Sequence, residues 1–270
     1  MKSLILLFTI FTSLNVWSQI HVGAVSTSTG GSGRGAVQSG DAGFINPATL
    51  VHLKGRSFYT AYQPGKTALS LSENTKDTIW ASSLGYYRDQ ISDRTQIQDV
   101  RLAVAEFAQQ KWSLGIAPHY YQLETSERRF AQPDVDVGMS FTPTPNMGIG
   151  IVGYNLMDDN KEIAQGYRPE ATSAIGINYI YRSFLRARLD VQSQKGHKWS
   201  EPTFGGGIES YATRWIVVRV GYLSDRDLKQ EMASGGIGFD MPRFRLNYGV
   251  VAQAQEFRDP RHVVDLSIPF

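Results

Sequence analysis

The chain has 270 residues, of which 41% are hydrophobic, 11% aromatic and 19% charged, and its formal net charge is +2. This near-neutral balance gives no indication of a nucleic-acid partner. The absence of cysteine excludes disulfides, thiolate metal sites and cysteine nucleophiles.

The first eighteen residues have the features of a cleaved export signal. Lys2 supplies a positive charge, an apolar run extends from Leu4 to Phe11, and Val16-Trp17-Ser18 precedes a predicted cut before Gln19. The apolar run is too short to span a bilayer as a helix. We therefore predict a signal peptide over residues 1–18. No apolar run of about 18 residues follows it, so no transmembrane helix is expected.

Residues 19–55 differ from the rest of the chain. The stretch from Ser26 to Gly35 is rich in Ser, Thr and Gly and predicts a flexible segment. From Asp41 to Leu50, turn residues are mixed with apolar ones. Asn46 is suited to cap a short helix and Pro47 to occupy its first position.

From Arg56 onward, apolar residues recur at every second position. Leu185, Ala187 and Leu189, for example, alternate with Arg186 and Arg188. A strand places such a set on one face, whereas a helix cannot. The pattern predicts an all-β fold of fourteen strands. The predicted strands cover residues 56–65, 66–74, 78–89, 98–109, 112–123, 132–142, 147–156, 171–182, 185–195, 202–212, 215–225, 231–240, 243–253 and 261–270.

From the third strand on, the predicted connections are short and long in turn. The short ones lie near residues 110–111, 144–146, 183–184, 213–214 and 241–242, and the long ones near 90–97, 124–131, 157–170, 196–201, 226–230 and 254–260. Transmembrane barrels have short periplasmic turns and longer outer loops. We therefore predict that residues 56–270 form an antiparallel barrel in the outer membrane of a Gram-negative bacterium, with membrane lipid and the barrel assembly machinery as partners.

A soluble sandwich or a lipocalin-like barrel is the alternative, because alternation alone fits it equally well. Three features oppose it: the sorting of the loops, the export signal and the last residue. The chain stops at Phe270 within an alternating strand, and such an aromatic end is expected to act as an assembly signal.

The charged face of the predicted strands is expected to line the lumen, because Arg or Lys facing lipid at mid-bilayer would cost about 2–4 kcal/mol each. These charges have two interpretations that the pattern leaves open. They could pair with one another, or they could form a site for an anionic group such as a carboxylate, which Arg binds well. The predicted lumen residues are Asp134, Asp136, Arg186, Arg188, Asp190, Arg219, Arg243, Arg245 and Asp265.

The segment from Gly40 to Leu50 resembles the N-terminal signature of the FadL/TodX barrels and their PorV-like relatives, a Gly/Ala-rich stretch that ends in Asn-Pro-Ala before the first strand. Thr49 stands where many members have Gly. The signature residues here are Gly40, Asp41, Gly43, Asn46, Pro47 and Ala48. Further similar stretches are residues 112–116, 148–156, 217–222 and 243–248. The resemblance implies a fourteen-stranded barrel in which residues 19–55 enter or close the lumen as a plug.

The same resemblance implies passive, porin-like transport of small hydrophobic or amphipathic molecules such as fatty acids. In the PorV-like branch it implies an adaptor for secreted proteins instead. A structural or interaction protein, including a homo-oligomer assembled around lipid, is therefore the second hypothesis. The short outer loops favour it.

No enzyme signature emerges from the chain. The five His have no metal-ligand partner at short helical spacing, and no Gly-x-Ser-x-Gly elbow occurs. His119, next to Tyr121 on the predicted lumen face, is the best candidate for a proton carrier, although a structural hydrogen bond is the more ordinary role for it. We expect no catalytic activity, cofactor or metal.

Overall fold

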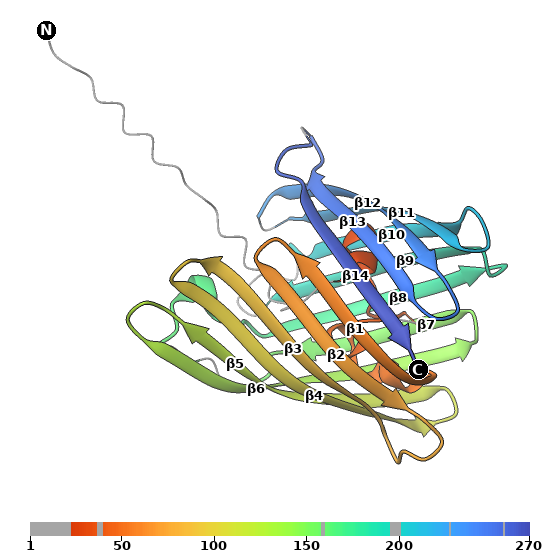
Figure 1. Ribbon diagram of the computed structural model, residues 1–270, viewed down its shortest axis with the longest axis horizontal. Coiled ribbons are helices and arrows are strands. Elements are labelled where there is room, and N and C mark those ends of the chain that lie inside the picture. The colour runs from red at the N-terminus through yellow and green to blue at the C-terminus, as the bar shows by residue number, and fades with distance from the viewer. Residues whose placement is uncertain (1–22, 37–39, 158–159, 195–200, 227, 256) are drawn as a thin grey trace, which may run out of the picture.

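The computed structural model describes residues 23–36, 40–157, 160–194, 201–226, 228–255 and 257–270. The predicted signal peptide lies outside these residues. Fourteen antiparallel strands form one closed barrel, which confirms the predicted fold class (Figure 1). The last strand pairs with the first, from Ser57 opposite Pro269 to Tyr62 opposite Val264. Closure leaves the sheet without an open edge.

The strands are β1 (Gly55–Gln63), β2 (Lys66–Asn74), β3 (Ala81–Ser92), β4 (Thr95–Gln109), β5 (Trp112–Glu124), β6 (Arg129–Thr144), β7 (Met147–Tyr154), β8 (Thr172–Tyr181), β9 (Leu185–Gln194), β10 (Thr203–Tyr211), β11 (Ile216–Asp225), β12 (Gln230–Asp240), β13 (Arg245–Gln253) and β14 (Arg261–Pro269).

The two ends of the barrel carry different connections. We call the end where β1 begins and β14 stops the terminal end, and the other the distal end. The longest connection, residues 155–171 between β7 and β8, lies at the distal end. The predicted long loop at 90–97 is wrong, because β3 and β4 continue to a turn at 93–94, and the loop at 124–131 shortens to 125–128. These strand ends are polar on both faces, so alternation stops although backbone pairing continues.

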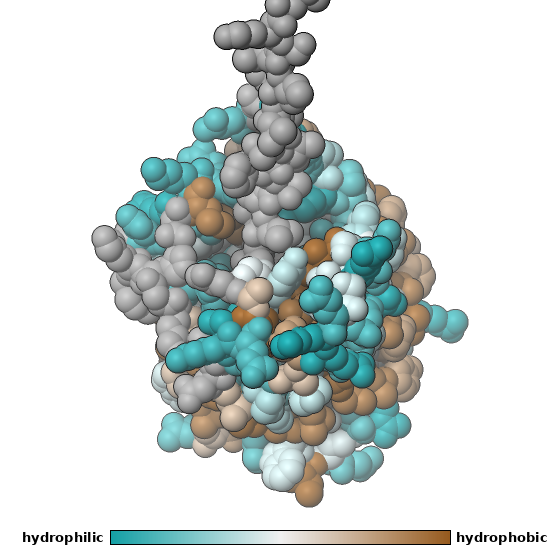
Figure 2. All heavy atoms as spheres, turned by 90° about the vertical axis from the view of Figure 1, so that its left-hand side faces the viewer, coloured by the Kyte–Doolittle hydropathy of each residue, from teal (hydrophilic) through white to brown (hydrophobic). Residues whose placement is uncertain are grey.

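The apolar side chains face outward and the polar ones inward. On the outside, Val220 is 63% exposed and Leu114 is 52% exposed, whereas Asp99 and Asp134 inside are 0% and 2% exposed. Figure 2 looks onto the left-hand side of Figure 1, where hydrophilic residues gather over the end and hydrophobic ones lie along the flank. A barrel with this distribution is suited to hydrocarbon around it. No helix among the described residues is long and apolar enough to cross a membrane.

The N-terminal segment lies inside the barrel as α1 (Ala24–Ser28), α2 (Ala42–Ile45) and the 3₁₀ helix η1 (Pro47–His52) (Figure 1). We call residues 24–52 the plug; residues 37–39 within it lie outside the described residues. As predicted, Pro47 begins a short helix, and the Asn46 side chain accepts a hydrogen bond from the Ala48 N–H at 3.1 Å. The predicted flexible stretch at 26–35 is wrong, because those residues are packed against the barrel wall.

Candidate functional site

The plug lies against the barrel wall at positions where the wall has glycine. A Cβ added at Gly150 would lie 1.9 Å from the Arg34 carbonyl oxygen, and one at Gly115 would lie 2.4 Å from the Ala48 nitrogen. We call these wall positions the glycine belt. The belt comprises Gly85, Gly115, Gly138, Gly150, Gly176, Gly205, Gly207, Gly221, Gly236 and Gly249. Any side chain there would occupy space that the plug fills, so plug and wall are fitted to each other.

Buried carboxylates on two separate strands, β9 and β14, hold the first part of the plug. Asp190 on β9 accepts hydrogen bonds from the Gly33 and Arg34 N–H groups at 2.8 and 3.0 Å, and it pairs with the Arg34 guanidinium at 2.9 Å. Asp265 on β14 accepts from the Ala24 N–H at 2.8 Å. Charge-assisted bonds of this kind are about twice as strong as neutral ones. They therefore fix where residues 24–34 lie.

Asn46 joins the two halves of the plug. Its side-chain nitrogen donates to the Arg34 carbonyl at 2.9 Å, while its oxygen accepts from Ala48. The Tyr154 hydroxyl on β7 donates to the Ile45 carbonyl beside it. The plug ends at His52, where burial lowers the pKa of the imidazole, so the neutral ring is favoured there.

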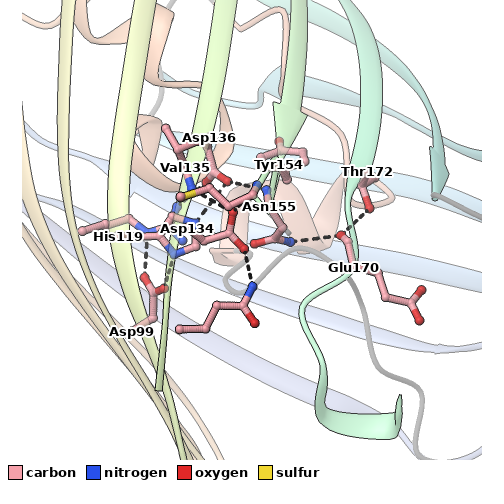
Figure 3. Close-up of polar contacts among 12 residues, drawn as sticks. Asp99, His119, Asp134, Val135, Asp136, Tyr154, Asn155, Glu170 and Thr172 are labelled. Carbon is pink, nitrogen blue, oxygen red and sulfur yellow. Dashed lines mark hydrogen bonds and ion pairs between the residues drawn. The ribbon is translucent and has the colours of Figure 1, made fainter. Parts of the chain in front are cut away.

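On the distal side of the plug, two acidic and two basic side chains form a closed ionic cluster, of which Figure 3 labels Asp99, His119 and Asp136. His119 Nδ1 lies 2.6 Å from Asp99 Oδ2, and His119 Nε2 lies 3.3 Å from Asp136 Oδ1. Arg101 pairs with Asp99 at 2.9 Å and with Asp136 at 3.0 Å, and its guanidinium lies 5.1 Å from the centre of the Phe44 ring in the plug. Both ring nitrogens of the fully buried His119 thus face carboxylates, which fits a structural support better than a proton carrier.

The connection between β7 and β8 folds into the distal mouth of the lumen, and we call residues 155–171 the distal cap. Asp136 accepts from the Asn155 N–H at 2.9 Å, and Asp134 accepts from the Met157 N–H at 3.0 Å (Figure 3). Ile163 is fully buried against Tyr121 and Leu123. The cap therefore places an apolar cluster at the distal mouth, above the polar middle of the lumen.

The predicted lumen residues fall into three groups. Arg186 is largely buried near the terminal end, and Arg245, half exposed there, pairs with Asp240 at 2.7 Å. Arg243 is a correction: β13 begins only at Arg245, so Arg243 lies exposed in the turn before it. The remaining residues are buried in the interior: Asp134, Asp136, Arg188, Asp190, Arg219 and Asp265.

The signature residues all belong to the plug, where Asp41, Gly43, Asn46, Pro47 and Ala48 are buried and Gly40 is exposed. Phe270 is 68% exposed beside β1, where its N–H donates to the Arg56 carbonyl. Sequence reasoning missed the inward charges Asp99, Arg101 and Glu209, although they alternate with apolar residues as the predicted ones do. It also missed the glycine belt. No group of three or more His, Asp or Glu placed to hold a metal occurs in the described ranges.

Neither a family model nor a curated protein matches the sequence. Solved structures do match. The Ralstonia pickettii toluene transporter TbuX superposes with a TM-score of 0.71 at 12% identity, over 94% of this chain and all of that one. The CymD monoaromatic hydrocarbon channel gives 0.67 at 13% identity, over 94% and 99%. A Pseudomonas aeruginosa FadL homologue gives 0.64 at 12% identity, over 91% and 97%. The barrel type expected from the resemblance is thereby confirmed as the fold of this chain.

Proposed function

We propose that this chain is an outer-membrane barrel for passive transport of small hydrophobic or amphipathic molecules. The observation that carries the proposal is the shared architecture: a closed fourteen-stranded barrel with its N-terminal segment inside, superposing along nearly its whole length on channels for toluene and other monoaromatic hydrocarbons.

The surface supports a place in the membrane. Outward-facing Leu, Ile, Val and Tyr side chains would contact lipid, and aromatic residues near strand ends, such as Tyr62 and Tyr181, suit the interfaces. Both ends have short turns, but the longest connections, residues 155–171, 195–202 and 254–260, all lie at the distal end, so the terminal end would face the periplasm. The predicted division into signal peptide 1–18, plug segment 19–55 and barrel 56–270 belongs to the same proposal.

The lumen supports a gated route. A hydrophobic molecule would enter at the distal mouth, where Tyr121, Leu123 and Ile163 form an apolar surface. The plug closes the lumen below it, in contact with the glycine belt. Passage therefore requires the plug to shift, and the transport rate depends on how firmly it is held.

A disulfide between plug and wall tests this route. A Cβ at Gly43 would lie 3.7 Å from the Ala103 Cβ, within the range of a disulfide, and the chain has no other cysteine. In vesicles with lipopolysaccharide in the outer leaflet, the native protein should admit toluene faster than protein-free vesicles do. The oxidised Gly43→Cys/Ala103→Cys variant should admit toluene more slowly than the native protein does. The same variant after reduction of the disulfide serves as its control. Native uptake equal to that of protein-free vesicles would overturn the proposal.

A structural or interaction role is the second candidate, because the plug fills the lumen so tightly at the glycine belt. This role predicts that the native, oxidised and reduced proteins all admit toluene no faster than protein-free vesicles do. It also predicts that cross-linking in intact membranes captures a second copy or a partner protein.

A further inference from the structure

Three arginines meet around one carboxylate inside the barrel near its terminal end. Arg186 Nη1 lies 3.1 Å from Glu209 Oε1, and Arg219 Nε lies 2.5 Å from Glu209 Oε2. Arg188 Nη2 lies 3.9 Å from the same oxygen. No second carboxylate in the described ranges pairs with any of these guanidinium groups. In direct ion pairs among the described residues, three guanidinium groups therefore share one carboxylate.

This charge is buried. The side chains of Arg188 and Arg219 are 3% and 6% exposed, and that of Arg186 is 14% exposed. The Nε of Arg186, the Nε of Arg188 and Nη1 of Arg219 have no hydrogen-bond partner among the described residues. Buried guanidinium donors without acceptors are strongly unfavourable. Such groups in a folded protein call for a further acceptor.

The arginines line a pocket that opens toward the terminal end. Its rim is formed by residues at strand ends, including Tyr211 of β10 and Ser267 of β14, while Val25 and Asp41 of the plug form its inner side. The pocket therefore lies on the side of the plug opposite the distal cap. Nothing bound in it would compete with a molecule at the distal mouth.

The other carboxylates around this pocket accept hydrogen bonds from further groups. Asp240 accepts from Arg245 at 2.7 Å and from the Tyr211 hydroxyl at 2.8 Å. Asp265 accepts from the Asn247 amide at 2.7 Å as well as from the plug. Asp41 accepts from the Gly23 N–H at 3.0 Å. Asp41 and Asp265 act on Arg188 and Arg219 only at longer range. Among the described residues, Glu209 is therefore the carboxylate that pairs directly with the three arginines.

We propose that this pocket binds an oxyanion, a carboxylate or phosphate group, through Arg186, Arg188 and Arg219. Glu209 orients the three guanidinium groups and competes with the anion for them. Planar guanidinium donors match both kinds of oxyanion. The group is carried by a small anion or by the head group of an amphipathic lipid. The site stands whether or not the barrel transports hydrophobic molecules.

Equilibrium dialysis of the purified full-length barrel in detergent against inorganic phosphate tests the site. Saturable binding is expected, and Arg188→Gln should weaken it about tenfold or more, since a charge-assisted bond is lost. Arg56→Gln is the control, because Arg56 pairs with Glu73 on the outside of the same barrel end. Equal phosphate binding by the native and Arg188→Gln proteins would overturn the proposal.

Glu209→Gln gives a second test that does not depend on how Arg188→Gln folds. Removing the competing carboxylate should tighten phosphate binding severalfold and make the midpoint of thermal unfolding rise with phosphate concentration. If the midpoint of thermal unfolding did not change with phosphate concentration in either the native or the Glu209→Gln protein, the proposed site would be contradicted. Measuring phosphorus in lipid extracts of the purified proteins distinguishes the two sources of the oxyanion. Lipid phosphorus that is bound to the native protein and lost in Arg188→Gln identifies a lipid head group. Binding of inorganic phosphate without bound lipid phosphorus identifies a small anion.

Discussion

At the scale of single residues, Asp190 is the strongest anchor of the plug, because one of its oxygens meets the two N–H groups and the guanidinium contributed by Gly33 and Arg34. We expect Asp190→Asn to remove the negative charge that pairs with the buried Arg34 guanidinium, at a loss of about 3–5 kcal/mol in the free energy of unfolding. Hydrogen exchange should accelerate in residues 24–36.

The matched control is Glu73→Gln, which removes the partner of Arg56 from an exposed ion pair on the barrel surface. Exposed pairs contribute at most about 1 kcal/mol, so this variant should keep native exchange in the plug. If Asp190→Asn exchanged no faster than Glu73→Gln in residues 24–36, the anchor would have no such role.

The glycine belt makes an equally local prediction. Gly150→Ala would put a methyl group 1.9 Å from the Arg34 carbonyl, whereas Gly235→Ala on β12 meets nothing nearer than 3.6 Å. We expect the first substitution to displace the plug, destabilising the protein by about 1–3 kcal/mol as overpacking does, and the second to be near neutral. Chemical denaturation of both variants in the same detergent measures the difference. Equal stabilities would show that the plug adapts freely.

At the scale of elements, the distal cap depends on carboxylates of a neighbouring strand. β6 starts at Arg129, but its pairing with β7 extends only as far as Val137. The distal cap, instead of β7, therefore lies beside the distal part of β6. Asp136→Asn should weaken the acceptor for the Asn155 N–H and the pairing with Arg101. We expect faster hydrogen exchange in residues 155–171.

A suitable comparison is Asp225→Asn, because Asp225 holds the Leu228 N–H in another distal connection at 2.9 Å. That variant should leave the distal cap unchanged. Equal exchange in residues 155–171 for both variants would mean that packing of Ile163, rather than the carboxylates, holds the cap.

Alternation identified the strands well where one face is polar and the other apolar. The predicted strand at 66–74 coincides with β2, and the one at 261–270 differs from β14 by one residue. The strand predicted at 98–109 begins instead at Thr95, since the polar residues there pair without alternating. Local signals also indicated that Asn46 and Pro47 begin a helix.

The contacts inside the lumen could not be predicted in the same way. Which wall residue meets which plug residue depends on how a segment folds within a closed ring, and Arg34 and Asp190 are 156 positions apart. In the sequence, the belt glycines cannot be told from other strand glycines. The reason for glycine at these positions is the close approach of the plug, which only the folded structure shows.

At the scale of the whole molecule, the outward face should tolerate charge according to depth. Val220 lies in the middle of β11 and is 63% exposed, while Tyr62 is 60% exposed near the end of β1. We expect Val220→Arg to destabilise the protein in lipid vesicles by about 2–4 kcal/mol and Tyr62→Arg by only about 0–1 kcal/mol. Reversible unfolding from bilayers measures both. A reversed order would mean that β11 does not face hydrocarbon at its centre.

Pairing of β1 with β14 around an occupied interior also constrains the order of biogenesis. The ring joins the two extremes of the strand region, so the seam forms only when the last strand is available. The plug is bonded to β9 on one side and to β14 at the seam itself. A plug that entered after closure would require the β1–β14 pairing to open again. We therefore expect the plug to dock while β1 and β14 pair, so that docking and barrel closure form one kinetic step.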